Sequence, residues 1–234
     1  FSGKMIAQPN GCTPTCRDTI HVNMLANAPC TAPIIEAADI LTTATCLGNY
    51  SLQMFSQSMA AQINQPLVGG FYVGSWRWAK TIYTPNDNSC MTKVYFFDKT
   101  PPVLTCKDTL ISCNVPLDTA TLGRPTVADN CSPNFYLLSK LGYSDQITDI
   151  GACTDDFIQK INRLWITVDQ SGNPATCIQK ITIKRPVLQT DVEFPLDKDI
   201  VACSQDKNNL ALTGQPIING RPINVPACGF SVQK

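Results

Sequence analysis

Cysteine is the residue type with the most evident chemistry in this chain, which holds twelve of them in 234 residues. No pair has the common Cys-x-x-Cys spacing of a zinc site, since three residues separate even Cys12 from Cys16, and His21 is the single histidine. An even number of scattered cysteines favours disulfides over a zinc or haem site. The pattern therefore indicates an oxidising compartment outside a reducing cytosol.

Nucleophilic catalysis has little support in the sequence. A serine or cysteine nucleophile commonly needs a histidine as its general base, and His21 lies in an apolar alternation typical of a strand. Only Glu36 and Glu193 are glutamates, and no carboxylate pair has a setting typical of glycoside cleavage. We expect no enzymatic activity, since an enzyme would need a deep cleft with convergent carboxylates.

Aspartates could supply oxygen ligands for a cation. Asp98, Asp129 and Asp169 each lie near the predicted end of a β module, where their carboxylates could share a Ca²⁺. The chain contains no Asp-x-Asp-x-Asp-Gly loop, so solvated turn carboxylates are the simpler interpretation. We expect no other cofactor.

Aromatic side chains could stack on a sugar. Trp76 and Trp78 are two residues apart in a strand-like run, so they point to one face. Trp78, like Trp165, is expected to fill a core against a disulfide bridge. Trp76 with Tyr72 could form a flat glycan platform, although core packing is the more frequent role of such aromatics.

The elements that position these residues are predicted to be strands. Sixteen of the eighteen acidic residues are aspartates, and seventeen prolines and thirteen glycines accompany them. These residues favour turns and disfavour helix interiors, so we expect an all-β protein. Zero net charge with dispersed Lys and Arg argues against a nucleic-acid partner, and no apolar run is long enough for membrane insertion.

Three segments share a cysteine followed by an apolar alternation, and we interpret them as the closing strands of successive modules. They begin at Cys16, Cys90 and Cys177, and the last two follow Trp78 and Trp165 at equal distances. The spacings of 74 and 87 residues indicate small modules. Such modules bury limited apolar surface and often need covalent staples.

This interpretation divides the chain into tandem immunoglobulin-like β-sandwich modules, of which the first and last are incomplete. Residues 1–27 would close a preceding or neighbouring module, 28–99 and 100–186 would be complete modules, and 187–234 would begin a further one. The prolines at 101–102 stiffen the joint between the two complete modules. Strands are expected at 51–56, 70–84, 90–97, 103–106, 109–113, 135–139, 159–168, 177–184, 187–193, 199–203 and 215–218.

Cysteine positions shared by the two complete modules suggest how they pair. Cys46 and Cys113 end an early strand, whereas Cys90 and Cys177 open the closing strand. Cys46–Cys90 and Cys113–Cys177 are therefore the simplest pairs, since one scheme serves both modules. Each would contribute about 4 kcal/mol to the free energy of unfolding in the chain-entropy model. A third pair within residues 100–186 would join Cys131 and Cys153.

This division predicts that the partners of four further cysteines lie outside their own modules: Cys12, Cys16, Cys203 and Cys228. One hypothesis is that residues 1–27 of one subunit complete the unfinished module of a neighbouring copy by strand addition. Cys16 would then pair with Cys203 between chains. The equally weighted alternative is that the sequence is an excerpt of one long polypeptide.

Longer motifs carry a family resemblance. Asp98-Lys-Thr-Pro-Pro-Val-Leu-Thr-Cys106, Asp129-Asn-Cys131 and the run from Trp165 to Cys177 resemble the hyalin-type (HYR-like) repeats of bacterial surface proteins. Asn10-Gly-Cys-Thr-Pro-Thr-Cys16 resembles the end of SprB-type repeats in gliding-motility adhesins of the Bacteroidota. Residues 100–186 are covered almost end to end. Ser171 stands where the hyalin-type pattern has another cysteine, so that family's pairing scheme does not carry over intact.

The resemblance implies a secreted, multi-repeat protein of the bacterial cell surface, and it makes one modification relevant. Thr19, Thr109 and Thr119 each follow an aspartate and precede an apolar residue, the acceptor pattern of O-glycosylation in the Bacteroidota. The alternative is that Asp-Thr simply suits turns and strand edges.

We therefore expect an adhesive or structural segment of an extracellular fibre, stalk or adhesin, with a filament subunit joined by strand complementation as one form. Its partners would be neighbouring copies or adjacent modules of a longer chain. The competing interpretation is a carbohydrate-binding accessory module with a glycan ligand.

Overall fold

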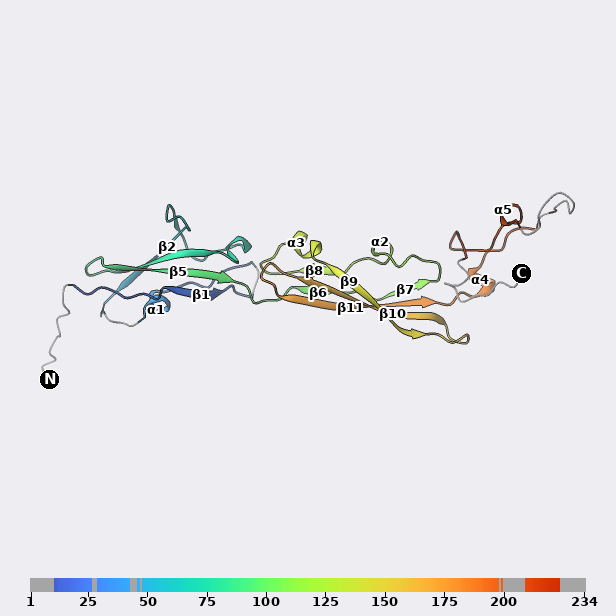
Figure 1. Ribbon diagram of the computed structural model, residues 1–234, viewed down its shortest axis with the longest axis horizontal. Helices are drawn as coiled ribbons and strands as arrows, with labels where there is room; N and C mark the ends of the chain where they lie inside the picture. The colour runs from blue at the N-terminus through green and yellow to red at the C-terminus, as the bar shows by residue number, and fades with distance from the viewer. Residues whose placement is uncertain are drawn as a thin grey trace. The chain divides into compact units, whose positions relative to one another are not determined.

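Strands dominate the computed structural model (Figure 1) and disulfides join them, which confirms the predicted all-β, disulfide-stapled class. The structure describes residues 11–26, 29–42, 46, 48–197, 199 and 209–223. Among these residues, no helix is long and apolar enough to cross a membrane.

The first sheet has five strands in the order β1-β5-β4-β2-β3. β1 runs parallel to β5, and the other neighbours are antiparallel. Buried and half-buried residues alternate along β4 and β5, as expected for strands with one face on a core. The strand bounds are β1 (Thr19–Asn23), β2 (Tyr50–Phe55), β3 (Gln62–Ile63), β4 (Trp76–Tyr83) and β5 (Ser89–Phe97).

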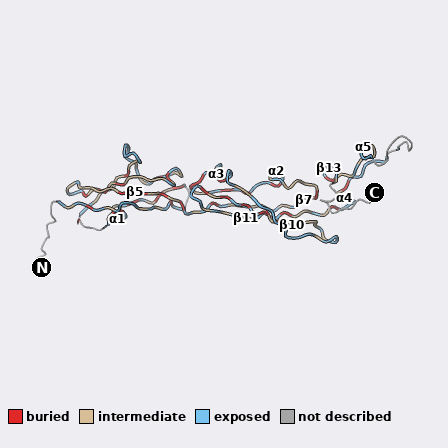
Figure 2. The backbone as a smooth tube through the Cα atoms, in the orientation of Figure 1, coloured by how far each residue is buried: buried red, intermediate tan, exposed pale blue. Residues whose placement is uncertain are grey.

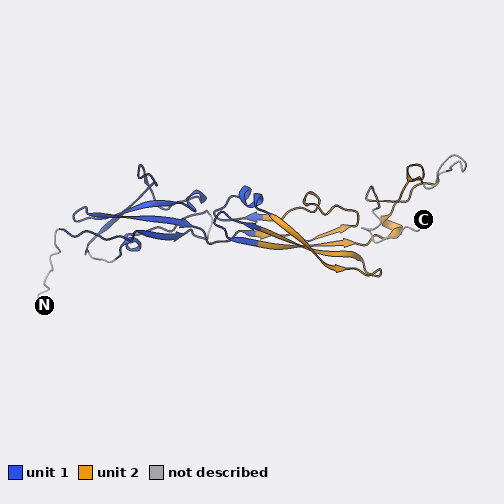
Figure 3. Ribbon diagram, viewed as in Figure 1, with its two compact units in different colours: residues 1–103, 127–141, 167–175 blue, residues 104–126, 142–166, 176–234 orange. Residues whose placement is uncertain are grey.

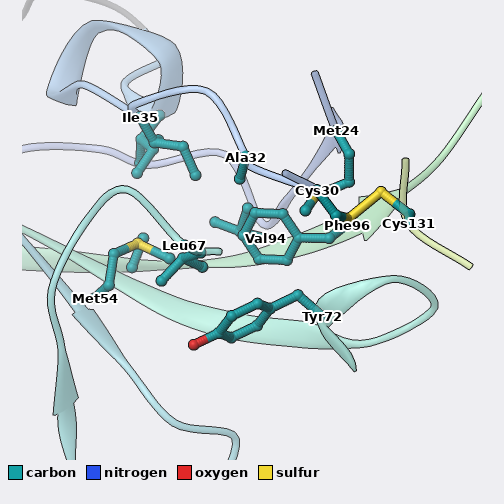
Figure 4. Packing of buried hydrophobic residues seen from close by; sticks show 12 residues of the cluster. Met24, Cys30, Ala32, Ile35, Met54, Leu67, Tyr72, Val94, Phe96 and Cys131 are labelled. Carbon is teal, nitrogen blue, oxygen red and sulfur yellow. A yellow bond between two sulfur atoms is a disulfide. The ribbon is translucent and has the colours of Figure 1, made fainter. Parts of the chain in front are cut away.

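The core of this sheet is covered by an irregular segment rather than by a second sheet (Figure 4). Met54, Val94 and Phe96 project from the strands onto residues 29–42, which include the short helix α1 (Ala37–Ile40). Residues from 29–42 and from the segment before and within the 3-10 helix η1 (Gly70–Tyr72) contribute six more members of the cluster, which also contains Met24, Ala79 and Cys131. The six are Cys30, Ala32, Ile35, Ile40, Leu67 and Tyr72.

The second sheet has four strands in the order β7-β11-β10-β9, and β6 pairs separately with β8. β7 runs parallel to β11, whereas β9 and β10 are antiparallel. The bounds are β6 (Val103–Thr105), β7 (Thr109–Ser112), β8 (Thr126–Ala128), β9 (Gly142–Ile150), β10 (Phe157–Val168) and β11 (Pro174–Lys184). Two short helices, α2 (Thr119–Leu122) and α3 (Asn134–Ser139), lie between strands of this set along the chain.

The two sheets repeat one topology, and this corrects the predicted position at which each module begins. In each, the first strand runs parallel to the last, and β1 therefore corresponds to β7 as β5 corresponds to β11. The prediction that residues 1–27 close a preceding module is wrong for the described part, because β1 is an opening strand. The sequence agrees: Cys16-Arg-Asp-Thr-Ile20 matches Cys106-Lys-Asp-Thr-Leu110.

Residues after β11 form small elements: α4 (Leu188–Asp191), α5 (Leu210–Thr213), β12 (Ile217–Ile218) and β13 (Arg221–Pro222). β12 and β13 form a hairpin around Asn219 and Gly220, whose φ angles of 51° and 71° suit the tight turns that join such strands. α4 stands where a strand was expected at 187–193. The expected strand at 199–203 lies almost wholly outside the described residues.

The helix α3 also replaces an expected strand, at 135–139. Apolar Phe135, Leu137 and Leu138 gave a strand-like pattern, but Pro133 precedes the segment as its N-cap. Thr167 of β10 donates its hydroxyl to the carbonyl of Leu137, which is fully buried. Tertiary packing thus decides the conformation of a short apolar run.

Two compact units divide the chain (Figure 3). Unit 1 comprises residues 1–103, 127–141 and 167–175, and unit 2 the remaining residues, 104–126, 142–166 and 176–234. The units differ from the sequence-based boundaries because parts of the predicted 100–186 module cluster with unit 1. Figure 2 shows buried residues in both units.

The core of unit 2 includes a polar centre. Leu122, Ile161 and Ile181 form one buried apolar cluster. Arg163 is 1% exposed, and its guanidinium binds both carboxylate oxygens of Asp145 at 2.7 and 2.8 Å and the carbonyl of Leu117. The hydrogen bond from Arg163 to Asp145 raises the pKa of Arg163 against the effect of burial.

Candidate functional site

Two disulfides occupy equivalent places in the two sheets. Cys16, just before β1, pairs with Cys90 of β5, and Cys106, shortly before β7, pairs with Cys177 of β11. The Cys16–Cys90 bridge follows from the register of β1 and β5. Thr19 lies opposite Lys93, which is 74 residues further along the chain, and Cys90 is also 74 residues after Cys16. Each bridge therefore locks the opening strand of a module to its closing strand.

The predicted pairings of these cysteines are wrong, because the strand after Cys16 opens a module and does not close one. The predicted Cys46–Cys90 and Cys113–Cys177 pairs do not form, since Cys46 pairs with Cys12 and Cys113 is bonded to another cysteine than Cys177. The predicted Cys131–Cys153 pair is also wrong: Cys131 pairs with Cys30, 101 residues away, and Cys153 is an exposed free thiol.

Strand complementation between chains is contradicted for the same residues. Cys16 bonds within its own chain and β1 pairs within its own sheet, so neither serves a neighbour in this structure. Cys203 and Cys228 lie outside the described residues.

The predicted sugar platform of Trp76 and Tyr72 is not formed. Tyr72 is 8% exposed and packs near Phe96 in the core, with the Arg77 guanidinium over its ring. Trp76 and Trp78 instead lie half-buried on the opposite face of β4 from Ala79. Trp78 therefore does not fill the core as predicted, whereas Trp165 does, at 2% exposed.

An aromatic strip results on the outer face of the first sheet. Trp76 and Trp78 contact edge to face at 5.4 Å, and the Lys93 ammonium lies over both rings at 5.3 and 5.5 Å. Tyr95 lies opposite Trp76 on the neighbouring strand and stacks on His21 at 5.5 Å. The strip is defined here as Trp76, Trp78, Tyr95 and His21.

Three aspartates form a carboxylate cluster within unit 1: Asp98, Asp129 and Asp169. Each is the first residue after a strand, following β5, β8 and β10 respectively. Their candidate ligand oxygens all lie within 4.8 Å of one another. The structure thus brings together the three aspartates that the sequence indicated.

Turn hydrogen bonds hold each carboxylate in place. Asp98 Oδ1 accepts from the backbone N–H of Thr100, and Asp169 Oδ1 accepts from those of Ser171 and Asn173. Asp129 Oδ2 accepts from two backbone N–H groups, those of Cys131 and Ser132. The side-chain amide of Asn173 donates to Asp169 Oδ2 at 2.7 Å and to the backbone carbonyl of Asp98 at 2.9 Å.

The electrostatics of this cluster are unfavourable for ionised carboxylates. Burial raises the pKa of Asp98, and the charges of Asp129 and Asp169 raise it further, against the opposing hydrogen bond from Thr100. Asp98 and Asp169 are 3% and 1% exposed. The Cys30–Cys131 bridge holds the chain beside Asp129, and Figure 4 shows it next to Phe96.

The predicted glycosylation threonines differ in their surroundings. Thr19 is exposed at the start of β1. Thr109 is half-buried, donates its hydroxyl to the carbonyl of Lys107 and accepts from the Gln179 side chain. Thr119 is half-buried at the first position of α2.

A hollow of about 660 Å³ lies along β1. It is lined by residues of β1 and of the segment 33–39, among them His21, Ile34 and Asp39. No carboxylate pair lines it, because Asp39 is its single acidic residue, and it is open on one side. β1 is the end strand of the first sheet, so the hollow lies along a sheet edge.

Sequence reasoning missed several residues of these sites. Cys30 was left without a role, although the 101-residue loop that it closes includes Asp98. Asn173 lies inside the run from Trp165 to Cys177, but its bridging of two aspartates depends on the fold. Tyr95 and His21 were recognised as strand residues without a place in an aromatic surface.

No family model and no curated protein sequence matches the chain. Among solved structures, the chain is similar to the protocadherin GammaB4 extracellular domain at 13% identity and a TM-score of 0.27, over 80% of this chain and 35% of that one. It is similar to titin domains z1z2 in complex with telethonin at 9% identity and a TM-score of 0.26, over 74% of this chain and 97% of that one. It is similar to human CDH23 EC21-23 at 10% identity and a TM-score of 0.27, over 74% of this chain and 69% of that one. The chain thus spans about a third of the protocadherin chain, and at these scores no shared function follows.

Proposed function

We propose that this chain is a structural segment of an extracellular surface fibre, stalk or adhesin, assembled from repeated β modules and without catalytic activity. The observation that carries the proposal is the repetition of one design. In each of two sheets the opening strand runs parallel to the closing strand, and a bridge joins the two. Repeated modules that are each closed by a disulfide suit a protein whose role depends on its length and surface rather than on a single binding pocket.

The covalent framework also supports an extracellular place. Four disulfides among the described residues fit an oxidising environment. The bacterial cell surface is the part of the proposal that rests on the resemblance of residues 98–177 to hyalin-type repeats. Partners would be adjacent modules or neighbouring copies.

Electron microscopy of intact source cells tests this proposal. Antibodies raised against the oxidised chain and detected with gold should label extended structures outside the cell. Cells from which the gene has been deleted serve as the control. Label confined to the cell interior, or found only on dispersed monomers in the medium, would contradict the proposal.

A second candidate function is carbohydrate binding by the aromatic strip. The observation that favours it is the set of half-buried Trp76, Trp78 and Tyr95 on one outer face, with Lys93 over two of the rings. Rings of this kind stack on the apolar faces of sugars. The relevant residues are Trp76 and Trp78, and not the predicted pair of Trp76 and Tyr72.

Titration of surface polysaccharides, followed by tryptophan fluorescence, tests the second candidate. Trp76→Ala should abolish binding, whereas Phe71→Ala should not, because Phe71 is a 71% exposed aromatic outside the strip. Equal loss in both variants, or no binding by the unaltered chain, would exclude the aromatic strip as a glycan site.

A further inference from the structure

The carboxylate cluster places three negative charges together without a counter-charge. The ligand oxygens of Asp98, Asp129 and Asp169 lie within 4.8 Å of one another. The ion pairs found in the described part of the chain join other residues: Lys160–Asp149, Arg163–Asp145 and Lys184–Asp191. Like charges at this distance and in this degree of burial repel strongly.

Two oxygens of the cluster are buried and have no hydrogen-bond partner. Asp98 is only 3% exposed. Its Oδ1 accepts a hydrogen bond from the backbone N–H of Thr100, while its Oδ2 has no hydrogen-bond donor. Asp129 repeats the pattern, with Oδ2 in a turn and Oδ1 buried without a partner. An ionised oxygen buried in this way costs free energy unless a positive group reaches it. The side-chain oxygen of Asn130, next in the chain, is also buried and unpartnered.

We propose that Asp98, Asp129 and Asp169 form a Ca²⁺-binding site. Calcium takes oxygen ligands at about 2.3–2.6 Å, so two oxygens on opposite sides of one ion are separated by about 5 Å at most. The observed limit of 4.8 Å satisfies this condition. The three residues offer no imidazole or thiolate, and Cys131 beside Asp129 is already oxidised, so a zinc or copper site does not fit.

The backbone arrangement explains how the site is prepared. Each carboxylate is held through one oxygen by turn N–H groups, and the Asn173 amide joins Asp169 to the Asp98 backbone. The ion would therefore tie together the ends of β5, β8 and β10 inside unit 1. This inference rests on the geometry of the cluster alone and does not depend on the proposed function.

Calorimetric titration of the oxidised, EDTA-stripped chain with CaCl₂ tests the site. We expect one Ca²⁺ per chain with a Kd of about 10⁻⁴ M, in the range of extracellular modules. At about 10 mM Ca²⁺ the Tm should rise by about 5 °C or more. Asp98→Asn and Asp129→Asn should each weaken binding at least tenfold. The control is Asp149→Asn, which alters the exposed ion pair with Lys160 and should leave Ca²⁺ binding as it is in the unaltered chain.

Melting without calcium separates a ligand role from a purely structural one. In EDTA, Asp98→Asn should melt at a higher temperature than the unaltered chain, because it removes a buried, repelled charge while keeping the Thr100 hydrogen bond. Asp129→Asn provides the same test should the first variant not fold. Absence of calcium binding up to about 10 mM, unchanged binding in both variants, or tighter binding of Mg²⁺ than of Ca²⁺ would each overturn the proposal.

Discussion

Cys16 and Cys106 hold the same position in two successive modules. Each precedes a strand that runs parallel to the last strand of its module, and each is bonded to a cysteine in that last strand. The loops they close are nearly equal, with separations of 74 and 71 residues. The two bridges are therefore one structural device used twice, and they should have similar effects on stability.

Removal of the Cys16–Cys90 bridge should strongly destabilise the first sheet. Closing a loop of this length stabilises the folded state by about 4 kcal/mol in the chain-entropy model. The double variant Cys16→Ser/Cys90→Ser should lose that amount in urea unfolding. Cys153→Ser is the control and should change stability by less than about 0.5 kcal/mol, because its thiol is exposed and unpaired. Equal losses in both would contradict a bridge-specific effect.

The ion pair of the buried Arg163 with Asp145 should be far more important than the exposed pair of Lys160 with Asp149, which joins the same two strands. Asp145→Ala leaves a 1% exposed guanidinium without its carboxylate and should cost about 3 kcal/mol. Asp149→Ala removes an exposed ion pair at 3.6 Å and should cost less than about 1 kcal/mol. Chemical denaturation of the two variants measures the difference. Similar losses would show that Arg163 is stabilised mainly by the Leu117 carbonyl.

Acid should remove the contribution of the α2 cap. The backbone N–H of Thr121 lowers the pKa of Asp118, so the folded state favours the ionised carboxylate. A carboxyl with a lowered pKa stabilises the fold above its unfolded pKa and loses that effect as pH falls through the folded value. Asp118→Ala should therefore have a lower Tm than the unaltered chain at about pH 7, and the difference should shrink below about pH 3.9. A constant difference down to about pH 2 would exclude an ionic contribution.

Glycosylation of the native protein should be found first on Thr19. Its side chain is exposed, whereas Thr109 is half-buried and its hydroxyl is engaged with Lys107 and Gln179. Peptide mass spectrometry of material from the source organism should show a hexose-sized addition on the Thr19 peptide. A modified Thr109 with an unmodified Thr19 would contradict the ranking by accessibility.

The sequence was sufficient to predict the strands whose patterns are strongest. β5, β10 and β11 were all expected near their observed bounds, because their apolar residues alternate clearly. β9 was missed, since nearly all of its residues are exposed and its pattern is polar. α3 was mistaken for a strand because a short apolar run fits either conformation.

Cysteine pairing shows why the rest could not be predicted. The apolar alternation after Cys16 fits an opening strand as well as a closing one, and the choice determined every pairing. The match of Cys16-Arg-Asp-Thr to Cys106-Lys-Asp-Thr was present in the sequence and would have fixed the phase. Cys30–Cys131 had no such signal, because it joins residues that only the fold brings together. The carboxylate cluster was indicated correctly in its members, whereas its burial and unpartnered oxygens required coordinates.

The bridges also determine how the stretch from Cys16 to Cys177 responds to a mechanical load. After unfolding, a pull on its two ends is transmitted from Cys16 directly to Cys90 and from Cys106 directly to Cys177, because the second covalent route, through Cys30–Cys131, is longer and stays slack. Residues 91–105 are then the part able to straighten, which limits the extension to about 50 Å even after complete unfolding. Reduction would remove this limit and release several hundred ångströms, so the thiol redox state sets how far this stretch can lengthen before it breaks.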